Sequence, residues 1–194
     1  MAERSVKIAT TSDEDSVIAL VVLAFGTDPA ARWTWPDPRQ YLQHFPDFIR
    51  ALGGNAFAHR SAYHIDGYAG AALWLPPGIA PDEDRLVALL QRTGSASVQE
   101  DLLAVFEHMG RYHPEEPHWY LPFIGVDPLQ QGKGQGGALM RHALVRCDQD
   151  HMPAYLESSN PKNIPLYRRY GFELLGTIQA GGSPPIFPML RKPR

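Results

Sequence analysis

Four glycines fall within six positions of this sequence, where an apolar segment passes into a helical pattern. They are Gly132, Gly134, Gly136 and Gly137. A glycine inside a regular element costs about 0.5–1 kcal/mol relative to alanine, so such a cluster indicates that bare backbone is needed there. Amide groups that converge without Cβ atoms at the start of a helix bind anions, because the helix dipole adds positive charge. The stretch therefore predicts a diphosphate-binding loop.

Two common kinds of diphosphate loop match this stretch incompletely. A Walker-type loop needs glycine where Asp127 stands and serine or threonine where Gly134 stands, so we exclude it. A dinucleotide-binding loop matches as text, because the glycines fit G-x-G-x-x-G and Glu157 follows 20 residues after the last of them. That loop should follow its strand directly, whereas residues 127–131 intervene here. An NAD(P)-dependent oxidoreductase is therefore a less favoured alternative.

The bulk composition narrows the class of protein. A chain of 194 residues with a net charge of -3 fits one domain, residues 1–194. This charge gives no general attraction to nucleic acid or to anionic membranes, so we expect neither as a partner. The longest apolar run, residues 17–25, is too short to cross a bilayer, and residues 1–5 lack the apolar region of a secretory signal. We expect a cytoplasmic protein.

Disulfide and metal chemistry find little support in the sequence. Cys147 is the single cysteine, so it forms no disulfide framework, and its place on the apolar side of a helix indicates an inert core residue. His108, His113 and His118 recur every five residues, a spacing that suits neither a helix face nor a strand face. We therefore predict no metal site.

Short apolar segments alternate with helical patterns along the chain. They predict strands at 6–10, 55–65, 68–75, 118–126, 154–157, 172–180 and 186–190. Amphipathic patterns predict helices at 11–25, 39–52, 81–92, 97–108, 138–150 and 160–170. Asp66-Gly67 predicts a hairpin turn, and Thr11 with Glu14 has the spacing of a capping box. The alternation predicts an α/β or α+β fold in which helices flank a mixed sheet.

Two motifs resemble the hallmarks of one enzyme superfamily. Residues 131–136, Gln-Gly-Lys-Gly-Gln-Gly, resemble the [Gln/Arg]-x-x-Gly-x-Gly/Ala loop of the GNAT superfamily of N-acetyltransferases. Residues 160–172 resemble its second hallmark, in which an asparagine precedes Leu-Tyr and Gly-Phe. Over roughly residues 114–194 the resemblance is closest to puromycin N-acetyltransferase-like members.

The resemblance implies a fold, a cosubstrate and a reaction. The fold is a mixed, mostly antiparallel sheet flanked by helices, with a splay between the fourth and fifth strands. The cosubstrate is acetyl-CoA, and the acetyl group passes directly to the primary amine of a small molecule in a ternary complex. An aminonucleoside antibiotic such as puromycin is one candidate acceptor. We expect a monomer or a homodimer, and a non-catalytic acyl-CoA-binding or sensing module of the same fold is the main alternative.

The resemblance also assigns residues to the coenzyme. Backbone groups of Ile124, Gly125 and Val126 are expected to hold pantetheine. Asn160 is expected to cap a helix and to touch the coenzyme. The diphosphate is expected to contact the backbone amides of the glycine loop and the side chains of Gln131 and Lys133. The residues of this loop are Gln131, Gly132, Lys133, Gly134, Gln135, Gly136 and Gly137.

The chemical step needs a proton donor and a proton acceptor. By the resemblance, Tyr167 protonates the departing thiolate, and a phenol of pKa near 10 still holds its proton at neutral pH. The acceptor amine must lose a proton before it attacks, and His118 and Glu157 are both candidates for that base. A surface histidine and a buried acid paired with arginine are the structural alternatives for these two residues.

Two further groups of residues are candidates for the surroundings of the acceptor. Strict alternation puts His118, Tyr120, Pro122, Ile124 and Val126 on one face of their strand. Aromatic residues elsewhere either line an acceptor pocket or pack in the core; they are Trp33, Trp35, Tyr41 and Trp74.

Overall fold

The protein, described here by a computed structural model over residues 5–94 and 96–194, is built on a seven-stranded sheet. The strand order is β1-β2-β3-β4-β5-β7-β6, and β4 with β5 is its parallel pair. The strands are β1 (Val6–Ile8), β2 (Ala62–Ile65), β3 (Gly70–Leu75), β4 (Trp119–Val126), β5 (Ala154–Ser158), β6 (Glu173–Leu174) and β7 (Phe187–Arg191). The mixed, mostly antiparallel sheet is confirmed. Residues 1–4, over which no secretory signal is expected, lie outside the described part.

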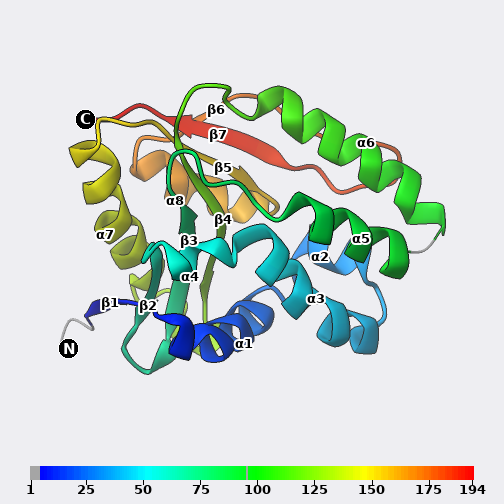
Figure 1. Ribbon diagram of the computed structural model, residues 1–194, viewed down its shortest axis with the longest axis horizontal. Coiled ribbons are helices and arrows are strands. Elements are labelled where there is room, and N and C mark those ends of the chain that lie inside the picture. Colours follow the sequence, from blue (N-terminus) through cyan, green and yellow to red (C-terminus); the bar gives the residue numbers. More distant parts are fainter. Residues whose placement is uncertain (1–4, 95) are drawn as a thin grey trace.

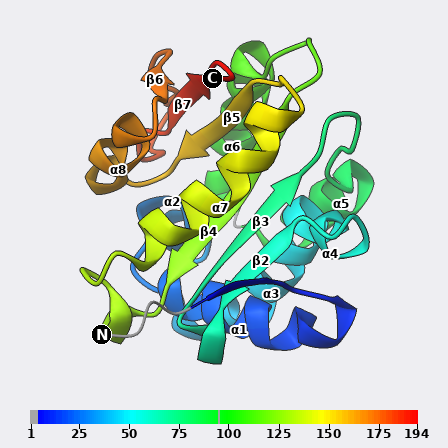
Figure 2. The same ribbon diagram turned by 90° about the vertical axis from the view of Figure 1, so that its left-hand side faces the viewer.

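Helices cover both faces of this sheet (Figures 1 and 2). The helices are α1 (Glu14–Ala24), α2 (Pro29–Thr34), α3 (Pro38–Gly53), α4 (Asn55–Ala58), α5 (Glu83–Thr93), α6 (Ala96–Tyr112), α7 (Gln135–Gln149) and α8 (Ile164–Arg169). One buried cluster joins α1, α2, α3, α5 and α6 to the sheet, and a second joins α7 and α8 to its other face. Of the described helices, none is long and apolar enough to cross a membrane.

Three predicted elements differ from the structure. The predicted strand at 55–65 is divided, because α4 occupies its first part and buries Ala56 and Phe57 in the core before β2 begins. The capping box forms one residue earlier than predicted, between Thr10 and Asp13. The predicted strand at 172–180 is reduced to β6 and an isolated bridge at Ile178. For the two predicted strands, a short apolar stretch was compatible with more than one element, and packing decided.

The strands β4 and β5 separate soon after they meet. Their pairing covers only Trp119 with Ala154 and Tyr120 with Tyr155, although β4 continues to Val126. Figure 2 shows the two strands diverging toward their carboxyl ends, with α2 behind the opening. The predicted splay between the fourth and fifth strands is confirmed.

A β-bulge in β4 overturns the predicted side-chain alternation. Leu73 pairs with Phe123 but Leu75 pairs with Tyr120, so β4 carries an extra residue opposite β3. Tyr120 therefore faces the cluster of α1 and α3, whereas Ile124 packs against the cluster of α7. These two side chains lie on opposite faces of the sheet, not on one face as strict alternation predicts.

Candidate active site

The glycine loop joins β4 to α7 through a turn at Pro128–Gln130. Gly132 and Gly134 have φ angles of 73° and 82°, the left-handed region that disfavours residues with a Cβ atom. A Cβ atom built on either glycine meets nothing within 4 Å. The backbone conformation, rather than lack of space, therefore requires glycine at these two positions.

The backbone amides of residues 131–137 form a continuous run of free donors. Among the described residues, none accepts a hydrogen bond from any of them, and the first amide that is bonded belongs to Ala138, which donates to the Gly134 carbonyl at 3.0 Å. The ammonium of Lys133 donates to the Leu129 carbonyl at 2.9 Å, and the side-chain Nε2 of Gln131 donates to the Val126 carbonyl at 3.2 Å. Free amides at the start of a helix make this loop an anion-binding site.

The last residues of β4 add two further free donors. The amide of Asp127 donates to the Ala69 carbonyl, which fixes that amide on the β3 side. Because successive residues of a strand point in opposite directions, the amides of Val126 and Ile124 point into the opening beside β5. Gly125 lies between them with its Cα against α1, where an added Cβ atom would come within 2.7 Å of the Ala24 side chain.

Tyr167 and Asn160 lie on the segment that follows β5. The Tyr167 side chain is 5% exposed and packs against Phe172, with a centroid distance of 6.2 Å. Burial, followed by the negative charge of Asp28, raises the pKa of Tyr167, so the phenol keeps its proton at neutral pH. Asn160 caps the turn at Pro161–Asn163 by accepting a hydrogen bond from the Lys162 amide at 3.1 Å.

Glu157, on β5, is a buried carboxylate that lacks a full set of partners. Its side chain is 4% exposed, and its Oε1 atom has no hydrogen-bond partner among the described residues. The neighbouring Tyr155 hydroxyl is likewise unpartnered. The alternative of a buried acid paired with arginine does not hold, because no described arginine pairs with Glu157. Buried polar atoms are nearly always hydrogen-bonded, so an exception beside a cavity indicates a functional site.

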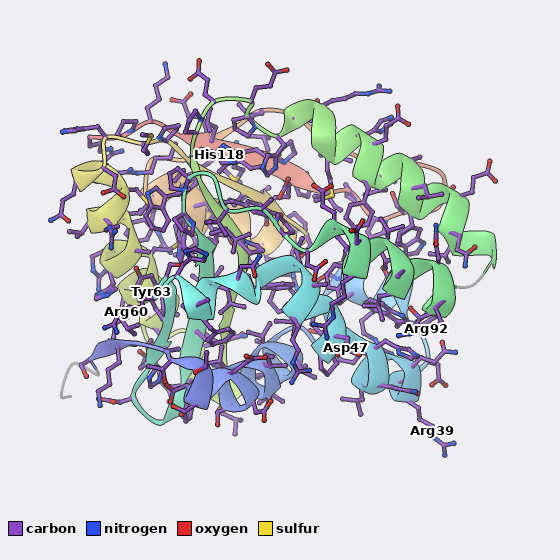
Figure 3. All side chains as sticks on the ribbon, viewed as in Figure 1. Arg39, Asp47, Arg60, Tyr63, Arg92 and His118 are labelled. Atoms are coloured by element: carbon purple, nitrogen blue, oxygen red, sulfur yellow. The ribbon has the colours of Figure 1, made fainter. Side chains whose placement is uncertain are left out.

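Two histidines connect Glu157 to the surface. The Nδ1 atom of His113 lies 3.7 Å from Glu157 Oε1, and its Nε2 atom lies 3.0 Å from His118 Nε2. His118 Nδ1 donates to the Glu116 carbonyl at 2.7 Å, so in neutral His118 the Nε2 atom accepts from His113. Figure 3 shows His118 at the loop that leads from α6 into β4.

Burial lowers the pKa of His118. Nearby His113 lowers it further, while the Glu116 carbonyl and the charge of Glu157 oppose this shift. His118 is therefore neutral near pH 7 and able to accept a proton from His113. The five-residue spacing of His113 from His118 gives no sign that the intervening loop brings the two rings together, so from the sequence His113 was a candidate only for metal binding.

An aromatic cavity lies beside Glu157, on the α2 and α3 face of the sheet. Its volume is about 120 Å³, and its walls include Phe25, Trp33, Trp35, Phe45, Phe48, Phe106, Tyr120 and Phe123. An outer groove of about 1000 Å³ between α5 and α6 reaches the same point, so Glu157 and Tyr120 line both spaces. Of the four aromatic residues predicted to line a pocket, Trp33 and Trp35 do so. Tyr41 packs in the core, and Trp74 lies in the cluster on the opposite face.

Within the described residues, no group of three histidine, cysteine, aspartate or glutamate side chains could hold a metal ion. Cys147 is fully buried in the core, and burial raises the pKa of its thiol to about 12. Such a thiol is protonated at neutral pH and is a poor nucleophile.

Comparison with known proteins identifies the family. Residues 25–172 match the sequence profile of the acetyltransferase (GNAT) family. The chain belongs to this family. It is an N-acetyltransferase, and the family uses an acyl-CoA cosubstrate. The antiparallel order of this GNAT sheet also excludes the dinucleotide-binding alternative, because that domain needs a parallel sheet.

Individual relatives agree with this assignment. An uncharacterized N-acetyltransferase of Schizosaccharomyces pombe is 28% identical over 180 residues, which cover 86% of this chain and 73% of that protein. A Corynebacterium glutamicum structure, described as histone acetyltransferase HPA2 and related acetyltransferase, has a TM-score of 0.70 and 25% identity, covering 98% of this chain and 97% of its own. The Drosophila melanogaster polyamine N-acetyltransferase has the same fold, with a TM-score of 0.66 and 15% identity over 98% of this chain and all of its own.

Proposed function

We propose that this protein transfers the acetyl group of acetyl-CoA to the primary amine of a small molecule, by direct attack within a ternary complex. The run of unbonded amides at residues 131–137, together with the amides of Val126 and Ile124 on the opened edge of β4, carries the proposal. It suits a ligand with a diphosphate at one end and an amide-containing chain at the other. Pantetheine in the opening would bring the thioester toward the aromatic cavity, where an amine reaches it.

In this proposal Glu157 removes the proton from the acceptor ammonium. The proton then passes to His113, whose side chain is 36% exposed, and from there to His118. The two base candidates from the sequence thereby act in one pathway rather than as rivals. A buried carboxylate is suited to this step because its charge is poorly screened.

Tyr167 donates the proton, or a hydrogen bond, to the departing thiolate. We expect Tyr167→Phe to lower kcat about tenfold to 100-fold while the affinity for acetyl-CoA changes little, because only the hydroxyl is lost from a packed ring. Steady-state kinetics with calorimetric titration of acetyl-CoA separate the two quantities. Tyr63→Phe is the matched control, since Tyr63 is also buried but lies beside α7, as Figure 3 shows. Unchanged turnover in Tyr167→Phe would remove the acid role.

The relay makes the rate depend on pH in a defined direction. Because burial lowers the pKa of His118 from its ordinary value of 6.5, activity is expected to fall only below pH 6.5, once His118 is protonated and accepts no proton. His118→Gln should lower kcat/KM about tenfold at pH 7 and abolish this inflection, since glutamine does not titrate. Profiles of kcat/KM from pH 5 to 8 test it, with His108→Gln as the control. An unchanged inflection in His118→Gln would contradict the relay.

The reaction itself is tested by thiol release from acetyl-CoA with a panel of amines. The panel includes puromycin, because of the likeness of residues 114–194, and agmatine, because the similar fly polyamine N-acetyltransferase forms N-acetylagmatine. Mass spectrometry must find the N-acetylated product. If acetyl-CoA binds but no amine is acetylated, a non-catalytic acyl-CoA sensor becomes the better description. If acetyl-CoA does not bind at millimolar concentration, the proposal fails.

A further inference from the structure

The aromatic cavity combines an apolar wall with very few charged groups. Besides the aromatic side chains, its wall is made of aliphatic residues such as Leu90, Leu102 and Val105, all less than 9% exposed. Asp28 and Glu157 are the carboxylates among its described lining residues, and that lining contains no lysine or arginine. The cavity therefore accommodates an apolar group. A buried cation needs a counterion, so the number of available carboxylates limits how many ammonium groups can enter the cavity.

Both carboxylate oxygens of Asp28 already accept hydrogen bonds within the protein. Its Oδ1 atom accepts hydrogen bonds from the amides of Ala30 and Ala31 at 3.0 and 3.1 Å. Its Oδ2 atom accepts a hydrogen bond from the Ser159 hydroxyl at 2.6 Å. These bonds cap α2 and hold it against the end of β5, so Asp28 positions the cavity wall and has little capacity left for a ligand cation.

Glu157 is left as the one carboxylate of the described lining with an unpartnered buried oxygen. In the proposed reaction it takes the proton of the reacting amine. It cannot at the same time neutralise a second ammonium group elsewhere on the acceptor. Other acids, Glu83, Glu115 and Glu116, line the outer groove, but all three are exposed, where ion pairs are weak and screened by salt.

We propose, as an extension of the proposed function, that the acceptor is an aryl- or alkyl-substituted monoamine whose apolar body fills the aromatic cavity, and that diamines and polyamines are excluded. A second ammonium group of a diamine would have to enter an apolar wall without a counterion, and burial of an unpaired charge is strongly unfavourable. An aromatic body of the same size would instead contact the rings that line the cavity.

The experiment compares acceptors matched in length. At saturating acetyl-CoA, kcat/KM is measured for 2-phenylethylamine, hexylamine and 1,6-diaminohexane. The two monoamines should exceed the diamine by tenfold or more. Equal or faster acetylation of the diamine would overturn the monoamine assignment and leave the acetyltransferase function standing. Acetylation of none of the three, nor of any amine in the wider panel, would instead overturn the proposed function and this inference with it.

A charge added to the wall provides a second test. Met109 lines both the cavity and the groove and is only partly buried, so a longer polar side chain can be accommodated there. Met109→Glu should raise the ratio of diamine to monoamine kcat/KM about tenfold, whereas Met109→Gln, of the same shape and without charge, should leave the ratio unchanged. The same ratio in both variants would count against exclusion by charge.

Discussion

Gly134→Asp is expected to weaken the binding of acetyl-CoA about 30-fold, which corresponds to about 2 kcal/mol. Gly134 precedes the first residue of α7 and has a φ angle of 82°. Aspartate tolerates the left-handed conformation better than most residues, so the backbone of the loop should persist. The new carboxylate would stand among the free amides of residues 131–137, where the diphosphate is proposed to bind, and would repel it.

Gly134→Asn separates charge from shape in this prediction. Asparagine has nearly the same size and also accepts the left-handed conformation, but it carries no charge. Its affinity for acetyl-CoA, measured by isothermal titration calorimetry, should stay within about threefold of the wild type. Equal weakening by both variants would mean that the loop conformation, and not repulsion of the diphosphate, limits binding. No weakening by Gly134→Asp would place the coenzyme elsewhere.

Glu157→Gln is expected to lower kcat/KM for the amine by about 100-fold or more at pH 7, because a glutamine amide cannot accept the proton of the ammonium. Acetyl-CoA affinity should be unchanged, since Glu157 is proposed to act only on the acceptor. The thermal stability should not fall, because the carboxylate is buried with an unpartnered oxygen and its replacement by a neutral group relieves that cost.

Glu116→Gln is the matched control for this variant. Glu116 is exposed and lies in the same loop as His118, and it contributes only its backbone carbonyl to the pathway. The control should retain the wild-type kcat/KM and pH profile. A decrease of less than about threefold in Glu157→Gln would exclude Glu157 as the base, and the acceptor proton would then have to leave by another route.

The local features of this protein are those that the sequence predicted well. The glycine loop and the helix after it follow from patterns within a few tens of residues. The predicted strand at 55–65 was wrong in its first part, because the conformation there depends on residues that are distant in the sequence. Ala56 and Phe57 are apolar in either conformation, and only their packing under α3 and β3 made them helical.

The β-bulge illustrates the same limit within the site itself. Alternation in β4 predicted that Tyr120 and Ile124 share one face, and the bulge opposite Leu73 and Leu75 places them on different faces. A bulge leaves no reliable mark in the sequence of one strand, because it is a property of the register between two strands. It nevertheless decides which amides point into the opening.

By itself the sequence determined the family, the glycine loop and the positions of most strands along the chain, because glycine conformations and apolar periodicity are properties of neighbouring residues. Only the tertiary structure brought His113 to Glu157 and His118, joined Asp28 to Ser159, and enclosed an aromatic cavity between α2, α3, α6 and β4. These contacts join residues up to 131 positions apart in the chain. Their geometry depends on packing between elements, so no local pattern records it.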